Sequence, residues 1–146
     1  MDRRARDRAA LRRRTRRRAY RDGARIHPLS TPAQVQRLRG AAPIKRMSEH
    51  ERSRMARIGE RFAAWGPGAS SAGINYTRIL EGILDFVLYQ QSRPWDHAPG
   101  AILLAEMGGV TIRPDGVPYR LADGRTDLLL TAANRACGRS VRAVVW

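Results

Sequence analysis

Residues 94–109 read PWDHAPGAILLAEMGG, and this stretch decides the fold. Asp96 stands where an N-cap residue belongs, Pro99 falls in the first turn, where a missing N–H costs nothing, and Gly108 is placed for a left-handed C-cap. The pattern predicts a short buried helix over residues 97–107 with Asp96 at its positive end. A carboxylate in that place is either a helix cap or a hard oxygen ligand of the kind that Mg²⁺ binds.

A run of small residues, 68–73, precedes this stretch and opens a second predicted helix over residues 71–82. Small side chains leave the first N–H groups of a helix accessible, so that the helix end can hold a phosphate. The other interpretation is an ordinary helix start capped by Ser70 or Ser71. Aromatic and branched residues then predict a strand near 84–89 that is buried on both faces.

The residues after 109 predict a closing set of strands and a helix. Strands are expected near 110–112 and 117–121, a third strand at 128–132, and a final helix from about 134. Because Pro114-Asp115-Gly116 has turn chemistry, an antiparallel pair is expected, and the sheet should be mixed. In the final helix we expect Cys137 to be a small core residue. Four further residues are expected to pack on the sheet: Ala136, Ser140, Ala143 and Val144.

A helix with a clear N-terminal capping signal is predicted over residues 48–65. Ser48 and Glu51 have the spacing of a capping box, and Gly66-Pro67-Gly68 stops the helix. Apolar residues follow at intervals of three and four, which indicates an amphipathic helix on a core. These residues are Met55, Ile58, Phe62 and Trp65.

The N-terminal part differs sharply in charge. The 146 residues include 28 basic and 13 acidic side chains, giving +15, and nearly all of this excess lies before residue 62. We expect residues 1–25 to be an Arg-rich unstructured arm, residues 26–47 an irregular connection, and residues 48–146 the folded part. The arm could bind nucleic acid without sequence preference, or it could be only a solvated arm. A third alternative is that a misplaced start codon or a shifted reading frame in GC-rich DNA produced this Arg-rich sequence. The arginines available for nucleic acid are Arg12, Arg13, Arg14, Arg16, Arg17 and Arg18.

Several classes of protein are excluded by composition. One cysteine excludes an internal disulfide framework and a cysteine-based zinc cage, and the three histidines have no metal-ligand spacing. No apolar run approaches the ~20 residues of a membrane span, and no apolar stretch of a signal peptide follows the basic start. A cytoplasmic protein without a membrane partner is the expectation.

The stretch 94–109 resembles the C-terminal signature of the inositol monophosphatase family. That signature is Trp-Asp, then small residues and Gly, an apolar helix, and Glu-Ala-Gly-Gly. The small-residue run upstream and the strands and helix downstream also match the family's order of elements, so the resemblance covers about residues 66–145. It implies an α/β fold, a layered mixed-sheet sandwich like the family's C-terminal subdomain.

The resemblance implies a magnesium-dependent phosphomonoesterase for a small phosphorylated metabolite. Asp96 would be a metal ligand, and Ser70, Ser71 and Ala72 would hold the phosphate or substrate. Tyr89, with Gln90 after it, lies where inositol-specific members place an acidic residue, so Tyr89 is a candidate substrate contact and a preference for inositol is not implied.

One part of the family pattern is absent from this sequence. The other metal ligands of the family come from an acidic residue and an Asp-Pro-x-Asp-Gly-Thr/Ser loop, neither of which occurs here. No catalytic residue is identifiable in this half. The expectation is a truncated C-terminal part, inactive alone, whose missing half would be an N-terminal half or a companion chain. In a further alternative the chain is non-catalytic, and the sheet edge that the missing half would cover drives self-association of two copies.

Overall fold

The computed structural model describes residues 19–27 and 29–146. The strands are β1 (Ala19–Arg21), β2 (Ala24–Ile26), β3 (Arg39–Ala41), β4 (Ala64–Gly66), β5 (Phe86–Tyr89), β6 (Val110–Ile112) and β7 (Leu129–Ala132). The helices are α2 (Glu49–Gly59), α3 (Ala72–Leu80), α4 (Pro94–Glu106) and α5 (Arg135–Val145), with short 3-10 turns η1 (Val35–Arg37) and η2 (Leu121–Asp123). The expected α/β class is therefore confirmed.

The core sheet has five strands in the order β4-β3-β5-β7-β6, and β1 and β2 form a separate antiparallel hairpin. Strand β3 runs parallel to both β4 and β5, whereas β7 runs antiparallel to β5 and β6. The sheet is mixed, as predicted.

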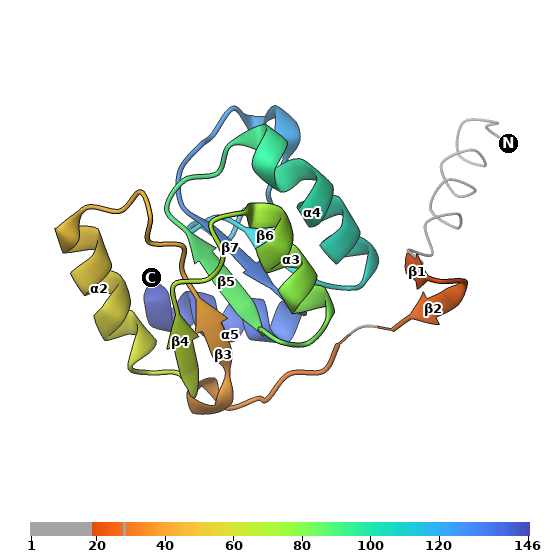
Figure 1. Ribbon diagram of the computed structural model, residues 1–146, viewed down its shortest axis with the longest axis horizontal. Helices are drawn as coiled ribbons and strands as arrows, with labels where there is room; N and C mark the ends of the chain where they lie inside the picture. The colour runs from red at the N-terminus through yellow and green to blue at the C-terminus, as the bar shows by residue number, and fades with distance from the viewer. Residues whose placement is uncertain (1–18, 28) are drawn as a thin grey trace, which may run out of the picture.

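Each of the three parallel strands leads into a helix. The chain passes from β3 to α2, from β4 to α3 and from β5 to α4, and the arrowheads of these strands point to one edge of the sheet (Figure 1). The N-termini of three helices consequently start from loops at the carboxyl ends of parallel strands. In open α/β sheets this edge is where ligands bind.

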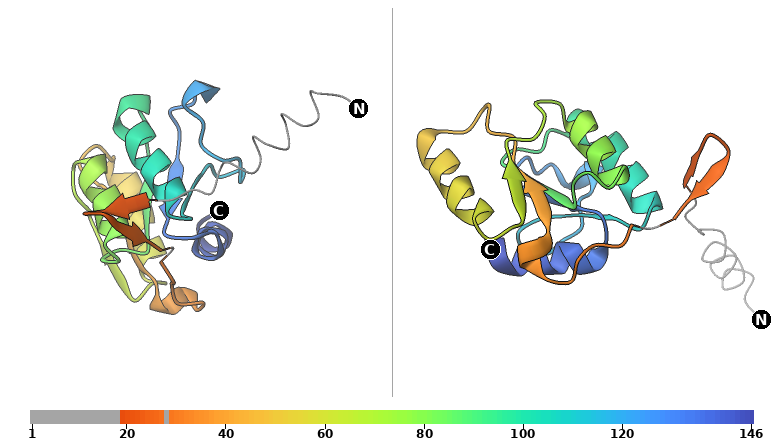
Figure 2. Two further views of the ribbon diagram at one scale, coloured as in Figure 1. Left: turned by 90° about the vertical axis from the view of Figure 1, so that its right-hand side faces the viewer. Right: turned by 60° about the horizontal axis from the view of Figure 1, so that its bottom comes forward.

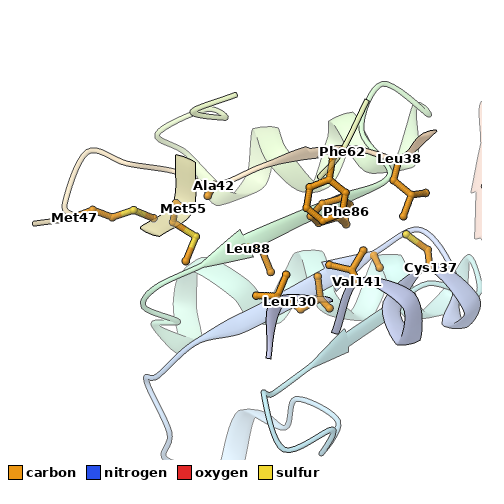
Figure 3. Packing of buried hydrophobic residues seen from close by; sticks show 12 residues of the cluster. Leu38, Ala42, Met47, Met55, Phe62, Phe86, Leu88, Leu130, Cys137 and Val141 are labelled. Atoms are coloured by element: carbon orange, nitrogen blue, oxygen red, sulfur yellow. The ribbon is translucent and has the colours of Figure 1, made fainter. Parts of the chain in front are cut away.

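The sheet lies between two layers of helices, with α3 and α4 on one face and α5 on the other (Figures 1 and 2). Side chains of β5 alternate between the faces because successive residues of a strand point in opposite directions. Phe86 and Leu88 join the core beneath α2 and α5, where Figure 3 shows them beside Leu130 and Val141. Val87 and Tyr89 join the second core, beneath α3 and α4.

The helix predicted over residues 48–65 ends at Gly59 instead. Its start is as expected, since Ser48 Oγ accepts from the Glu51 N–H at 3.2 Å and Glu51 Oε2 accepts from the Ser48 N–H at 2.7 Å. Beyond Gly59 the chain reverses and Trp65 enters strand β4, with its ring where a Cβ of Gly59 would lie. The apolar spacing was therefore not a single helical stripe, because the Phe62 and Trp65 rings pack against Phe86 of strand β5.

The segment 26–47, expected to be irregular, contains η1 and the strand β3. Leu38, just before β3, is fully buried in the core under α2 and α5. Of the predicted arm, residues 1–18 lie outside the described residues, and so do the six arginines named for nucleic acid; residues 19–26 form the β1–β2 hairpin.

Two expectations near the C-terminus are corrected. The strand predicted over 117–121 is reduced to a single bridge between Ile112 and Pro118, because the chain then turns into η2. Of the four residues of α5 predicted to pack on the sheet, Val144 packs against the core and Ser140 is half-buried, but Ala136 and Ala143 are exposed. The buried residues of α5 are Cys137, Gly138, Val141 and Val145.

Candidate functional site

A cavity of about 720 Å³ lies at the carboxyl edge of the parallel strands. Its walls are the loops that follow β3, β4 and β5 and the first turns of the helices behind them, which is the edge that the topology favours. The lining residues used below are Lys45, Arg46, Glu51, Ser70, Ser71, Ala72, Gly73, Tyr89, Gln90, Gln91, Arg93, Trp95, Asp96, His97 and Gly100. The cavity thus brings together every described residue that the sequence predicted for the site.

The loop before α3 is held by a side chain of the helix itself. Ser71 is the N-cap of α3, but neither predicted serine cap is present, since the Ser71 side chain makes no cap hydrogen bond. Instead Asn75, fully buried, binds both the N–H and the carbonyl of Ala69. Ala72 and Gly73 line the cavity in the first turn of α3, where backbone N–H groups have no partner within the helix.

Asp96 lies in the first turn of α4 and is not its N-cap. The helix begins at Pro94, three residues earlier than predicted, because Pro94 takes the first helical position and leaves Arg93 as the N-cap. Among the described residues no hydrogen bond or ion pair engages the Asp96 carboxylate. Pro99 lies inside the helix, and the positive φ of Gly108 agrees with the predicted left-handed end.

The predicted burial of this helix is also wrong. Only His97 and Leu104 of α4 are buried, and Trp95 at the rim of the cavity is 71% exposed. Helix α4 packs on α3 along one side, where Gly100 allows the Tyr76 ring to approach the backbone.

The buried residues Tyr89 and His97 line the cavity, and the Tyr76 ring packs against both of them. The Tyr76 hydroxyl and His97 Nδ1 are hydrogen bonded at 3.2 Å, and the rings of His97 and Tyr89 meet edge to face with centroids 4.5 Å apart. Burial lowers the pKa of His97 to about 4 and raises the pKa values of both tyrosines well above their ordinary range. This cluster of three rings therefore carries no charge near neutral pH.

Tyr89, the candidate substrate contact, lines the cavity through its ring. Its side chain is 5% exposed, and its hydroxyl has no hydrogen-bond partner within the described part of the chain. The ring packs on His97 and Tyr76. Tyr89 therefore shapes the cavity wall, and any contact with a ligand would be through the ring.

Three cationic side chains of the site were missed by the sequence analysis. Lys45 and Arg46 come from the loop after β3, and Arg93 comes from the end of the loop after β5. In the sequence each resembles an ordinary surface residue. Only the parallel pairing of β3 and β5 brings their loops to one edge, and the three-residue strand β3 gave no sequence signal.

A fourth missed residue, Arg113, supports the loop between β5 and α4. The guanidinium of Arg113 is completely buried and donates from Nη1 to Ser92 Oγ at 2.6 Å, next to the N-cap of α4. The same group donates to the Arg125 carbonyl at 2.9 Å and pairs with Asp123 at 3.3 Å. Arg113 therefore ties the loop before α4 to the loop after η2.

The described residues do not by themselves make a magnesium centre. No group of three or more His, Cys, Asp or Glu side chains that could hold a metal occurs in residues 19–27 and 29–146. Of the two carboxylates that line the cavity, Glu51 is committed to capping α2, which leaves Asp96. A Mg²⁺ ion is held by one or two carboxylates together with phosphate and water, and one carboxylate alone holds it weakly.

Comparison with known proteins gives consistent matches. The model of the inositol monophosphatase family matches residues 11–143. No curated protein sequence matches the chain. In the part of the chain that is described, no helix is long and apolar enough to cross a membrane.

The chain also superposes on solved inositol monophosphatases. The enzyme from Anabaena (Nostoc) sp. PCC 7120 gives a TM-score of 0.68 at 18% identity, covering 86% of this chain and 49% of that one. The Thermotoga maritima enzyme gives 0.69 at 21% identity, with 88% and 47% covered. Inositol monophosphatase-II from Staphylococcus aureus MSSA476 gives 0.67 at 18% identity, with 85% and 45% covered. The chain spans about half the length of these structures.

Proposed function

The chain belongs to the inositol monophosphatase family, and we propose that it forms the C-terminal part of a magnesium-dependent phosphomonoesterase for a small phosphate ester. The observation that carries this proposal is the cavity itself. The N-terminus of α3 follows strand β4, and Asp96 lies in α4, which follows strand β5. Both line the same cavity.

In this proposal the two walls have different roles. Asp96 supplies carboxylate oxygen for Mg²⁺, for which its free oxygens suit a hard cation. The N–H groups of Ala72 and Gly73 hold the phosphate at the positive end of α3, together with the hydroxyls of Ser70 and Ser71.

The proposed metal site is incomplete in this chain. Since Asp96 is the one uncommitted carboxylate of the described cavity, further metal ligands must come from elsewhere. We propose an N-terminal half, a companion chain or a second copy of this chain as their source, with no hydrolysis by the chain alone. The exposed β4 edge of the sheet is available for such pairing.

The test is a calorimetric titration of Mg²⁺, with phosphate present, into the chain and into Asp96→Asn. We expect weak binding, in the low millimolar range, that is lost in Asp96→Asn and kept in the control Glu106→Gln, which removes a carboxylate from the far end of the same helix. Identical heats for the chain and Asp96→Asn would overturn the metal-ligand role. A parallel assay should detect no phosphate release by the chain alone. Mg²⁺-dependent turnover by the chain alone would contradict the proposal that its metal site needs further ligands.

A further inference from the structure

Over the described part of the chain, four buried side-chain polar atoms have no hydrogen-bond partner. They are the hydroxyl oxygens of Tyr89, Thr111 and Tyr119 and the Nε of Arg113. Arg113 is fully buried, so bulk solvent does not reach its Nε–H. A buried polar group that lacks a partner is costly, and proteins nearly always satisfy such a group with another protein group or with water. Three of the four atoms belong to the short segment 111–119, which indicates one common site.

The three residues of this segment point to the same side of the sheet. The Tyr119 N–H donates to the Thr111 carbonyl at 2.8 Å, which places these two residues opposite each other on antiparallel segments. Arg113 lies two residues after Thr111, and side chains two apart on a strand share a face. The Cζ atom of Arg113 lies 5.3 Å from the centroid of the Tyr119 ring. Since Tyr119 packs on the core beneath α3 and α4, the three polar groups lie on that side of the sheet.

Tyr76 of α3 borders the same polar layer. Burial raises the pKa of Tyr76, and the nearby Thr111 hydroxyl opposes this rise. The two hydroxyls are thus neighbours, yet no hydrogen bond of ordinary distance and angle joins them. The Tyr76 hydroxyl is hydrogen bonded instead to His97 Nδ1, at 3.2 Å. Neighbouring polar groups that do not touch are commonly bridged by water.

The charges around this layer favour a neutral occupant. The Arg113 guanidinium is paired with two carboxylates, Asp123 at 3.3 Å and Asp127 at 3.1 Å. An anion would need positive charge that is not already neutralised, and the guanidinium would repel a cation. The Arg113 Nε–H needs an acceptor, whereas the two hydroxyls can each donate or accept. A water molecule can accept from the first and bond to both of the others, and buried waters typically make about three such bonds.

We infer that internal water occupies this layer, bonded to the Nε–H of Arg113 and to the hydroxyls of Thr111 and Tyr119. The water connects two parts of the fold. On one side is the Arg113 network, which holds the loop before α4, and on the other is the Tyr76–His97 pair beside the cavity. The inference is independent of the proposed function, since it involves neither Mg²⁺ nor a substrate.

The first test is NMR of the unaltered full chain. The Hε proton of a buried arginine exchanges slowly with solvent, so a rotating-frame Overhauser cross-peak between this proton and water reports a water molecule in contact with it. We expect such cross-peaks at Arg113 Hε and at the Thr111 methyl group, with the sign of a dipolar contact and not of exchange. The absence of both cross-peaks would overturn the inference. An Arg113 Hε resonance that shifts when sulfate replaces chloride in the buffer would indicate a bound anion and would also overturn it.

The second test uses two variants that each remove one hydroxyl, Thr111→Val and Tyr119→Phe. Oxygen-17 magnetic relaxation dispersion counts the water molecules that stay bound longer than the chain takes to tumble. We expect each variant to hold about one such water fewer and to unfold at lower urea, because the other partners of the water lose a hydrogen bond. The control is Thr131→Val, directly opposite Thr111 on β7. Its hydroxyl donates to the Val87 carbonyl at 3.4 Å, so its loss should leave the water count unchanged.

The sign of the stability change separates a hydrated layer from a dry one. In a dry layer the two hydroxyls are unpaired, and replacing an unpaired buried hydroxyl with an apolar group of similar shape is neutral or stabilising. An unchanged water count together with an equal or higher urea midpoint in both variants would therefore overturn the inference. A lower count in both variants, with Thr131→Val unchanged, supports it. Neither result bears on the Mg²⁺ titration of Asp96→Asn.

Discussion

Asn75 closes the loop before α3 onto the helix, since its Nδ2 donates to the Ala69 carbonyl at 2.9 Å and its Oδ1 accepts from the Ala69 N–H at 2.8 Å. The side chain is fully buried and replaces the serine cap that the sequence suggested. Gly68, at a positive φ of 62°, lets the loop turn toward this amide. The proposed phosphate-holding segment is therefore set by an interaction within its own helix.

Asn75→Ala should loosen this loop. Two hydrogen bonds are lost and two backbone groups of Ala69 lose their partner, so we expect a loss of about 2–3 kcal/mol in the free energy of unfolding. Urea unfolding measures the loss, and hydrogen exchange of the Ala69 N–H locates it. The control is Thr77→Ala, whose exposed hydroxyl only donates to the Gly73 carbonyl within α3. Unchanged exchange at Ala69 in Asn75→Ala would contradict the assigned role.

The elements that the sequence predicted well are those with local signals. The capping box of α2, the small-residue start of α3 and the Gly108 end of α4 depend on neighbouring residues. The family signature then placed Asp96 and residues 70–72 in one site. These features require no knowledge of distant contacts.

The elements that were missed depend on distant contacts. Strand β3 has the sequence Arg39-Gly40-Ala41, which has little strand propensity, and its place is set by Phe86, whose ring occupies the space of a Gly40 side chain. Without β3 the loop that carries Lys45 and Arg46 could not be assigned to the cavity. The buried role of Arg113 was invisible for the same reason, since its partners lie in two other loops.

Arg113 should be the most sensitive charged residue of the fold. Arg113→Met removes the donors to Ser92 Oγ and to the partly buried carbonyls of Arg125 and Asp127, so we expect a loss of roughly 3 kcal/mol in the free energy of unfolding. The matched control is Arg125→Ala, whose exposed ion pairs should cost much less. Urea unfolding of both variants provides the comparison. An equal or larger loss in Arg125→Ala would refute the assignment.

The aspartates around Arg113 should make the fold sensitive to acid. The hydrogen bond from Arg125 lowers the pKa of Asp127; for Asp123, burial opposes the shift, but the Arg125 N–H and the Arg113 charge lower its pKa overall. A lowered pKa stabilises the fold above the unfolded value of about 3.9, and this contribution is lost as the pH falls through the folded value.

Asp123→Asn combined with Asp127→Asn should therefore flatten the decline of stability below about pH 4. Urea unfolding at pH values from 2.5 to 6 measures the slope, with Glu106→Gln as the control. If the double variant kept the slope of the unaltered chain, these two groups would not be the source of acid sensitivity.

Gly100 should tolerate no side chain, whereas Gly73 should accept one. A Cβ at Gly100 would overlap the Tyr76 ring, so Gly100→Ala should push α3 and α4 apart at a cost of about 1–3 kcal/mol. Gly73 lies in α3 with only Ser71 Oγ nearby, at 3.7 Å, and Gly73→Ala should be neutral or stabilising by up to about 1 kcal/mol. Thermal unfolding of both variants tests the pair, and equal effects would contradict the close packing of the two helices.

Cys137 should be unreactive in the folded chain. The residue is 2% exposed, its thiol donates to the Asp85 carbonyl at 3.6 Å, and burial raises the pKa of the thiol to about 12. The thiolate is the nucleophile, so a thiol with a strongly raised pKa is unreactive at pH 8. Ellman's reagent should thus label the chain at pH 8 only as fast as it unfolds, with labelling across a urea series following the unfolding curve measured by circular dichroism.

The raised pKa of Cys137 also makes the stability of the fold depend on pH in the alkaline range. Because the folded value is raised, the stabilisation is complete below the unfolded value of about 8.5 and is lost as the pH rises toward 12. Cys137→Ala removes this titration, so the free energy of unfolding of the variant should decline less between about pH 8.5 and pH 12 than that of the unaltered chain. Rapid labelling of the folded chain at pH 8 without urea would contradict the core position, because a thiol packed against the sheet reacts only after α5 leaves it.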